Sequence, residues 1–304
     1  MNIPTIFASL EPSTTNSRTR TFLSKMIRSV KRFIVDRPWH SFWGVIVFAI
    51  IFIGVFAPII SPYNPYVADV TNMQGAPDKQ HWFGTDNLGR DLTSRLIYGA
   101  RTSLLVAACS VTFGTLIGGT WGIVSGYLGG KVDLIGERFI EILLAVPGLI
   151  FAYMLVIVLG ASMWTVIFAL GVSRIPSIAR TVRSVVLGIK ETMYVEAAKS
   201  MGATQFRIMW KHVFPQCISV LIVLITLNIG GIIIAEASLS YLGVGINPPT
   251  PSWGKMLAEA GSSLYPLWWF VAAPGLLITL TVLSFNLFGD GVRDAMDPRL
   301  RGTV

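Results

Sequence analysis

The hydrophobic pattern of the chain is dominated by five stretches free of charged residues: 38–68, 102–130, 142–173, 212–235 and 260–289. A transmembrane helix needs about 20 predominantly apolar residues, so each stretch can supply at least one. The third stretch is too long for one helix, and the segment VLGASMW around Gly160 divides it. The pattern therefore predicts six transmembrane helices, near residues 42–61, 103–127, 138–159, 164–186, 214–237 and 268–289.

The polar intervals carry local signals for helix ends. The stretch EAAKSMGATQFRIMWKHVFP, residues 196–215, is too polar for a span and falls between the fourth and fifth spans. Thr192 can cap a helix that ends at Gly202, and Thr204 can cap a second helix. Pro215 suits the first turn of the fifth span. The sequence thus predicts a helix–turn–helix elbow, with an ordinary connecting loop as the alternative. Its small residues would let another protein approach the backbone closely; they are Ala197, Ala198 and Gly202.

Composition agrees with a membrane protein, because 53% of the residues are hydrophobic and 13% are charged. Soluble domains carry about 25% charged residues. We therefore expect an all-α integral membrane protein.

The net charge of +8 is distributed unevenly along the chain. If the N-terminus is cytosolic, 19 of the 24 Lys and Arg residues fall in segments on the cytosolic side. The positive-inside rule then places both termini and the elbow in the cytosol. This bias accounts for the basic excess, so no nucleic acid is expected as a partner. Membrane lipids are expected, because residues 21–37 have the pattern of a basic amphipathic helix on the inner leaflet.

Two outer loops contain further structure. Ser252 can cap a short helix whose apolar positions Trp253, Met256 and Ala260 share one face. Before the second span, the segment LGRDLTSRL explains four charged residues as helix caps and solvated charges rather than as a catalytic site; they are Asp86, Arg90, Asp91 and Arg95. The three histidines belong to no metal-binding spacing, and we expect no enzyme and no metal.

Four stretches, in order along the chain, resemble one family. Glu196, Ala197 and Ala198, followed by Gly202 and Pro215, resemble the EAA loop of ABC-importer permeases, although this chain ends in HVFP where I-x-L-P is usual. The stretches HWFGTDNLGRDLTSRLIYGARTSL, SYLGVGINPPTPSWG and FNLFGDGVRDAMDPRLRG resemble the outer loops and tail of the C-type subunit in dipeptide, oligopeptide and nickel permeases. Together these stretches cover most of residues 40–300.

The resemblance implies the type I importer permease fold and a coupling helix that sits in a groove of a cytosolic ATPase. Glu196 is then the expected polar anchor and Ala197, Ala198 and Gly202 the points of close contact. The implied organisation is a cytosolic segment, a first helix with its outer loop, a permease domain with coupling loop 190–215, and a cytosolic tail. These segments span 1–38, 39–100, 101–290 and 291–304.

The resemblance also implies partners: a homologous B-type permease, two ATPase subunits and an extracytoplasmic substrate-binding protein. The chain has no phosphate-binding loop of the form G-x-x-x-x-G-K-[ST]. We therefore expect a transport subunit without enzyme activity or a cofactor of its own, with ATP and Mg²⁺ bound by the ATPases.

Among the charged residues within the predicted spans, three are candidates for the translocation path or for an intramembrane charge: Glu141, Arg174 and Glu236. The fourth span must continue past Arg174, which places this residue ~15 Å deep at 1.5 Å per residue. An ionisable residue at that depth is a functional hypothesis by default. Arg174 either faces the translocation path or pairs internally with Glu141 or Glu236. The prolines within predicted spans are expected to be kinks rather than hinges; they are Pro147, Pro176 and Pro274.

Peptides are the expected cargo, with nickel or metal chelates, glutathione and oligosaccharides as alternatives. A secondary transporter or channel, or a membrane scaffold, is the competing reading from another functional class. The expected location is the inner membrane of a bacterium or archaeon.

Overall fold

A computed structural model describes residues 33–262 and 267–296 of the chain. Within these residues the structure is helical, and the β pairing is limited to an isolated bridge between Thr85 and Asp91. The predicted helix over residues 21–37 lies mostly outside the described residues, and the tail beyond Met296 lies wholly outside them. The elements are α2 (Pro38–Val55), α3 (Ala57–Ile60), the 3₁₀ turn η1 (Val70–Asn72), α4 (Leu92–Leu128), α5 (Gly130–Leu144), α6 (Gly148–Leu159), α7 (Met163–Lys190), α8 (Met193–Ser200), α9 (Gln205–Ile208), the π-helix η2 (Met209–Val213), α10 (Phe214–Tyr241), α11 (Trp253–Gly261) and α12 (Trp268–Met296).

Five helical runs in the described residues are long and apolar enough to cross a membrane. They match the predicted first, second, fourth, fifth and sixth spans and confirm the all-α membrane architecture. Pro176 and Pro274 lie inside α7 and α12, as predicted. The five runs are Pro38–Val55, Leu92–Leu128, Met163–Lys190, Gln205–Tyr241 and Trp268–Met296.

The predicted third span, 138–159, is wrong as a continuous helix. α5 and α6 meet at an angle of 83°, so they form one broken span at most. Pro147 lies between them, at the N-cap of α6, and not within a helix. The break has a physical cause, because the proline ring disfavours helical backbone at the residue before it. α6 alone is about 18 Å long and too short to cross a bilayer core of about 30 Å.

α4 and α7 are packed backbone to backbone through a glycine seam on α4. A Cβ added at Gly114 would lie 2.8 Å from the carbonyl oxygen of Gly171, and one at Gly118 would lie 2.8 Å from that of Ile175. Gly122 faces the carbonyl of Ala179 even more closely. Small residues four apart allow transmembrane helices to approach in this way. α4 and α7 therefore form the central pair of the bundle.

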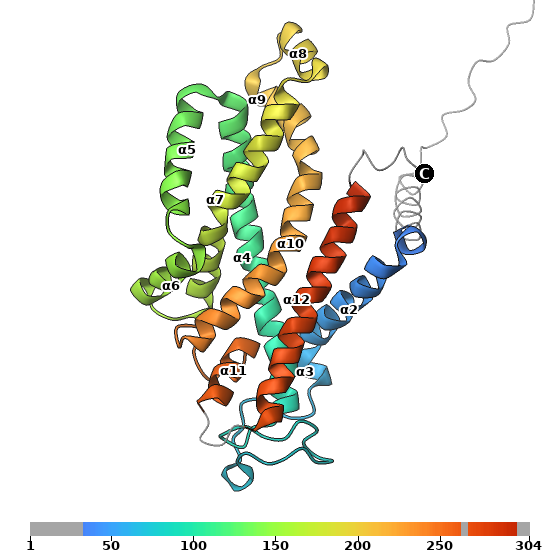
Figure 1. Cartoon of the computed structure of the whole chain (residues 1–304), viewed down its shortest axis with the longest axis vertical. Helices are drawn as coiled ribbons and strands as arrows, with labels where there is room; N and C mark the ends of the chain where they lie inside the picture. Colours follow the sequence, from blue (N-terminus) through green and yellow to red (C-terminus); the bar gives the residue numbers. More distant parts are fainter. Residues whose placement is uncertain (1–32, 263–266, 297–304) are drawn as a thin grey trace, which may run out of the picture.

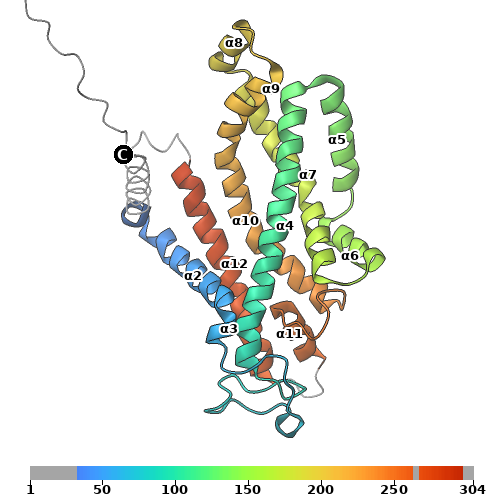
Figure 2. The ribbon, with the colours of Figure 1, turned by 180° about the vertical axis from the view of Figure 1, so that it is seen from behind.

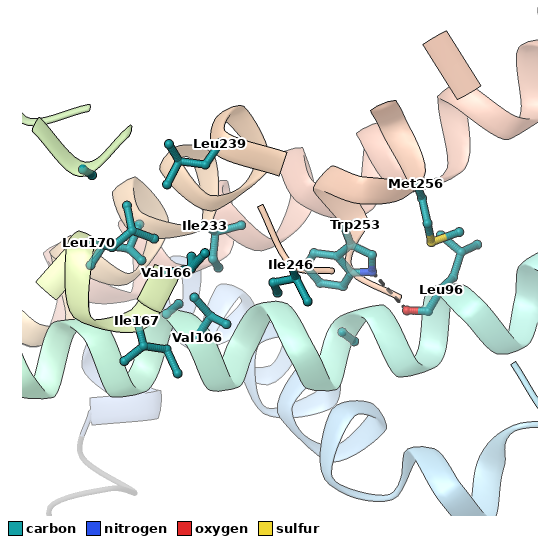
Figure 3. Packing of buried hydrophobic residues seen from close by; sticks show 14 of the residues in the cluster. Leu96, Val106, Val166, Ile167, Leu170, Ile233, Leu239, Ile246, Trp253 and Met256 are labelled. Carbon is teal, nitrogen blue, oxygen red and sulfur yellow. Dashed lines mark hydrogen bonds between the residues drawn. The ribbon is translucent and has the colours of Figure 1, made fainter. Parts of the chain in front are cut away.

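Two apolar cores stabilise the bundle within the part of the chain that the structure describes. The larger core joins α4, α7, α10 and α11, with Val106, Ile167 and Ile233 interdigitating between the helices (Figure 3). The buried Trp253 of α11 donates its indole N–H to the carbonyl oxygen of Leu96 in α4 at 3.0 Å (Figure 3). The smaller core lies under α8 and includes Val182, Val195 and Ile208.

The two ends of the bundle are different. α8 and α9 project at one end, while α11 and the loop between α3 and α4 lie at the other (Figure 1). α2 begins, and α12 ends, on the side of α8, and the reverse view shows the same arrangement (Figure 2). The bundle thus presents an elbow at one end and a looped cap at the other.

Candidate coupling elbow and intramembrane charges

The elbow between α7 and α10 is built by the predicted turn residues. Gly202 has a φ of 78°, in the left-handed region that glycine adopts at little cost. Its N–H donates to the carbonyl of Lys199 at 2.9 Å, and the N–H of Ala203 donates to that of Ala198 at 3.1 Å. The hydroxyl of Thr204 then accepts from the N–H of Arg207 at 3.3 Å and caps α9. The chain therefore reverses sharply between α8 and α9.

The elbow is continuous with α10. α9 runs through the π-helix η2 directly into α10, so residues 205–241 form one helical run. Pro215 stands at the start of α10 and has no N–H with which to continue the regular α-helical bonding. The wider π turn lies immediately before it. A displacement of the elbow would therefore act directly on a membrane-spanning helix.

One face of the elbow belongs to the core of the chain itself. Val195, Ile208 and Val213 are fully buried or nearly so, beneath α8 and α9. Ala198 is only 3% exposed and lies in the same cluster. The expectation that Ala198 is available to another protein is therefore not met, because this small residue packs inward.

The opposite face of the elbow is exposed. It carries Glu196, Ala197 and Gly202, and a Cβ added at Gly202 would meet no atom within 4 Å. Three large apolar side chains accompany them: Met193, Met201 and Phe206 are 87%, 80% and 68% exposed. The sequence did not single these out, because an apolar residue beside a span is normally assumed to be buried. Large apolar side chains exposed together on a projecting elbow make it a candidate interaction site.

Glu141 does not pair with Arg174. Its carboxylate accepts from Arg138 at 2.9 Å, one turn away on α5, and both side chains are largely exposed. The predicted internal pair between Arg174 and Glu141 is therefore wrong. The break between α5 and α6 explains the error, because it leaves Glu141 on a separate amphipathic helix.

Glu236 does not pair with Arg174 either. It is 1% exposed on α10, and three serine hydroxyls donate to its carboxylate. Ser103 of α4 does so at 3.2 Å, and Ser240 and Ser252 each do so at 2.9 Å. Since Ser252 is the N-cap of α11, the positive end of the α11 dipole also favours the carboxylate. Glu236 therefore joins three helices through hydrogen bonds.

The loop before α4 and the first turn of α4 contain a buried charge cluster that the sequence interpretation described as solvated. Asp86, Arg90 and Arg95 are 0%, 7% and 1% exposed. Asp86 accepts from Nε of Arg90 at 2.6 Å, and Glu259 of α11 accepts from Arg95 at 2.9 Å and from Arg90 at 3.2 Å. Two carboxylates thus balance two guanidinium groups. The cluster, named here the Glu259 cluster, fastens the loop and α4 to α11.

Other side chains in this loop cap its turns, as predicted for Asp91. Asp91 accepts from both the N–H and the hydroxyl of Ser94, at 2.7 and 2.6 Å, and lies 2.8 Å from Nδ1 of His81. The hydroxyl of Thr71, 2.6 Å from Asp69, and the N–H of Thr71 lower the pKa of Asp69 below its usual value. The loop is therefore held by local hydrogen bonds as well as by the Glu259 cluster.

Comparison with known proteins places these features in context. Residues 118–302 match the family described as "Binding-protein-dependent transport system inner membrane component". The glutathione transport system permease protein GsiD of Escherichia coli O1:K1 is 40% identical over 281 residues, which cover 88% of this chain and 93% of that protein. Its counterpart from Pectobacterium atrosepticum is 40% identical over 280 residues, with the same coverage.

The fold also has a relative among solved structures. An inward-facing structure of the MetNI methionine ABC transporter matches with a TM-score of 0.57 at 21% identity, over 66% of this chain and 96% of that chain. At this identity the likeness concerns the fold alone.

Proposed function

The chain belongs to the family of binding-protein-dependent transport system inner membrane components, the permease subunits of ABC importers, and on this premise we propose that it helps to import short peptides. In this proposal the chain forms half of the translocation path, and the α8–α9 elbow docks on cytosolic ATPases. Family membership decides against the secondary-transporter and channel alternatives. The named relatives are bacterial, which supports a bacterial inner membrane and gives no support to the archaeal option.

The cargo proposal rests on similarity to glutathione permeases over nearly the whole chain. Glutathione is itself a tripeptide, so the expected peptide cargo and the glutathione alternative share their chemistry. Both offer free carboxylates, an amine and polar amides. Uptake of glutathione and of a dipeptide by cells that carry the whole importer, each competing against the other, tests which is preferred.

The docking proposal is carried by one observation: the elbow has a buried face that belongs to this chain and an exposed face with no partner among the described residues. Met193, Met201 and Phe206 would lose their contact with water on docking, which supplies a hydrophobic driving force. Glu196 and Ala197 lie on the same exposed side. The helical run into α10 would then transmit motion of the ATPases to the membrane.

The remaining proposed partners are those that membership of the importer family implies. The chain has no phosphate-binding loop, so two ATPase subunits would bind ATP and Mg²⁺. A homologous B-type permease would complete the path, and an extracytoplasmic binding protein would deliver the cargo.

A bulky side chain at the turn tests the docking proposal. Gly202→Trp has space in the free chain, so we expect normal membrane abundance but a loss of ATP-dependent uptake of about tenfold or more, equivalent to ~1.4 kcal/mol of docking free energy per decade. Uptake of radiolabelled glutathione or dipeptide at equal abundance is the measurement.

The matched control is Gly202→Ala. Alanine has no special tolerance of the left-handed backbone, so this variant carries the conformational cost of an ordinary L residue at a φ of 78° with little bulk. We expect it to keep most of the uptake. Normal uptake by Gly202→Trp would remove the docking role, and an equal loss in both variants would assign the effect to the backbone of the turn.

A further inference from the structure

From Ser173 onward, α7 has a polar face inside a membrane-spanning helix. Hydroxyl side chains recur at i, i+4, i+8 and i+11, a spacing that places them on one side of the helix. The opposite side is buried and apolar, with Ile178, Val182 and Val186 at 1% exposure or less. Named here the α7 polar face, it consists of Ser173, Arg174, Ser177, Arg180, Thr181 and Ser184.

The exposed hydroxyls of the α7 polar face point away from α4, whereas Arg174 lies at the edge of this face, next to α4 and α10. The glycine seam of α4 contacts the backbone of α7 at Ile175 and Ala179, on the other side of the helix. α7 lies in front of α4, between α5 and α10, and the reverse view places α4 in front of α7 (Figures 1 and 2). Ser177, Thr181 and Ser184 are exposed on this outward side.

The hydroxyl groups alone do not identify what the face meets. Ser177 donates to the carbonyl of Arg174 at 3.0 Å, Thr181 to that of Ser177 at 2.9 Å, and Ser184 to that of Thr181 at 2.7 Å. Hydroxyls that are satisfied by their own helix can also face lipid. A charged residue on the same face is the decisive observation.

Arg174 is that residue. It is the twelfth residue of α7, about 16 Å from the start of the helix at 1.5 Å per residue. Arg180 and Arg183 of the same helix have carboxylates of α5 as ion-pair partners, whereas Arg174 has none among the described residues. Its guanidinium also makes no hydrogen bond to the described residues, and the side chain is only partly buried. An uncompensated guanidinium at this depth is costly in lipid.

Glycines make room for this side chain. A Cβ at Gly114 of α4 would lie 3.3 Å from Cβ of Arg174, and a Cβ at Gly231 of α10 would lie 3.1 Å from its Nη2. The stem therefore passes α4 closely, and the head lies against bare backbone of α10. A larger residue at Gly231 would press on the guanidinium.

We propose that the α7 polar face lines the water-filled path of the importer and that Arg174 binds a carboxylate of the passing substrate. The carboxylate follows from charge complementarity, since a guanidinium offers a planar fork of N–H donors that matches a carboxylate. This assignment of Arg174 rests on the proposed peptide cargo, which carries free carboxylates, whereas the water-filled path does not depend on the cargo.

Cysteine accessibility tests the path in the assembled importer, with Cys109 and Cys217 replaced by alanine. Thr181→Cys is expected to react with membrane-impermeant methanethiosulfonate reagents at least about tenfold faster than Leu283→Cys. Leu283 is the matched control because it is an apolar residue, 43% exposed, about as far along α12 as Thr181 is along α7. An unreactive Thr181→Cys overturns the proposal for any cargo.

Reagent charge tests Arg174. Ser177→Cys lies one turn from Arg174. There, the guanidinium is expected to raise the ratio of two labelling rates, that of a sulfonate-bearing reagent over that of a trimethylammonium-bearing one. Arg174→Gln should lower this rate ratio several-fold, and Arg174→Lys should retain most of it. An unchanged ratio in Arg174→Gln overturns the anion site, whether or not peptides are the cargo.

Transport separates this inference from the proposed function. Wild-type importer should take up a dipeptide better than its C-terminal amide, and Arg174→Gln should lose that preference while the assembled subunits remain together. If the mutant keeps the preference, or loses both substrates equally, the carboxylate contact is wrong. If the wild type imports neither glutathione nor dipeptides, the peptide function fails, and the two labelling experiments still decide on the path and the anion site.

Discussion

At the scale of single residues, buried charges at the α11 end of the bundle hold distant segments together. Arg95 and Glu259 are 164 positions apart in sequence, yet they share a hydrogen bond of 2.9 Å. Desolvating such groups is costly, so a balanced cluster adds little net stability, but removing one member leaves an uncompensated charge. The intact Glu259 cluster therefore adds little net stability, but removing one of its members is expected to destabilise the fold strongly.

We predict that Glu259→Gln lowers the free energy of unfolding by about 3 kcal/mol, the lower end for a broken buried pair because Glu259 is 21% exposed. The control is Glu141→Gln, which breaks an exposed pair and should cost about 0–1 kcal/mol. Thermal unfolding in detergent measures both. Equal melting temperatures for the two variants would contradict the buried network.

Sequence reasoning succeeded at most positions where the signal was local, although the hydroxyl of Thr192, at the N-cap of α8, donates to the carbonyl of Ile189 and does not cap the helix. The N-caps Asp91, Thr204 and Ser252, and the turn at Gly202, depend on residues within one helical turn, so their residue types suffice to predict them. The partners of Glu236 and the buried side of Ala198 depend on helices brought together by folding. No pattern within one segment contains that information, and these assignments were wrong or absent.

At the scale of elements, the bundle depends on how closely its helices approach. Gly114, Gly118 and Gly122 bring α4 against the backbone of α7, and a proline between α5 and α6 divides what looked like a span. The sequence already indicated that the segment before this proline is not a regular membrane span. α5 contains Asp133, Glu137 and Glu141, which fit an amphipathic helix better than a lipid-facing one.

A methyl group in the seam tests the first feature. Gly118→Ala would place its Cβ 2.8 Å from the carbonyl oxygen of Ile175, so the helices must separate, at an expected cost of about 1–3 kcal/mol. Gly188→Ala on α7 meets no atom within 4 Å and should be neutral or stabilising by up to about 1 kcal/mol. Unfolding temperatures in detergent compare them. Similar stability of both variants would show that the seam tolerates a side chain.

At the scale of the whole molecule, the two ends of the bundle differ in a way that suits transport. The elbow, the start of α2 and the end of α12 lie toward one end, where the sequence places most Lys and Arg residues (Figure 1). The looped cap, held by Glu236 and the Glu259 cluster, lies at the other. The positive-inside rule predicts that the elbow faces the cytosol.

Labelling in intact cells tests this orientation. In a background without Cys109 and Cys217, Lys79→Cys in the exposed loop before α4 should react with an impermeant thiol reagent. In cells that lack the ATPase subunits proposed to cover the elbow, Ala197→Cys should react only after the membrane is permeabilised. Labelling of Ala197→Cys in intact cells, with Lys79→Cys protected, would invert the predicted orientation.

If ATPases drive this importer subunit by binding its elbow, they should be recovered together with it. The most direct test is a mild-detergent pull-down of the tagged chain from its own membranes, followed by mass spectrometry. We predict recovery of a homologous permease, ATPases with phosphate-binding loops and an external binding protein. With Gly202→Trp, we predict that the permease remains and the ATPases are lost. Recovery of the wild-type chain alone, or only with copies of itself, from membranes active in transport would contradict this function.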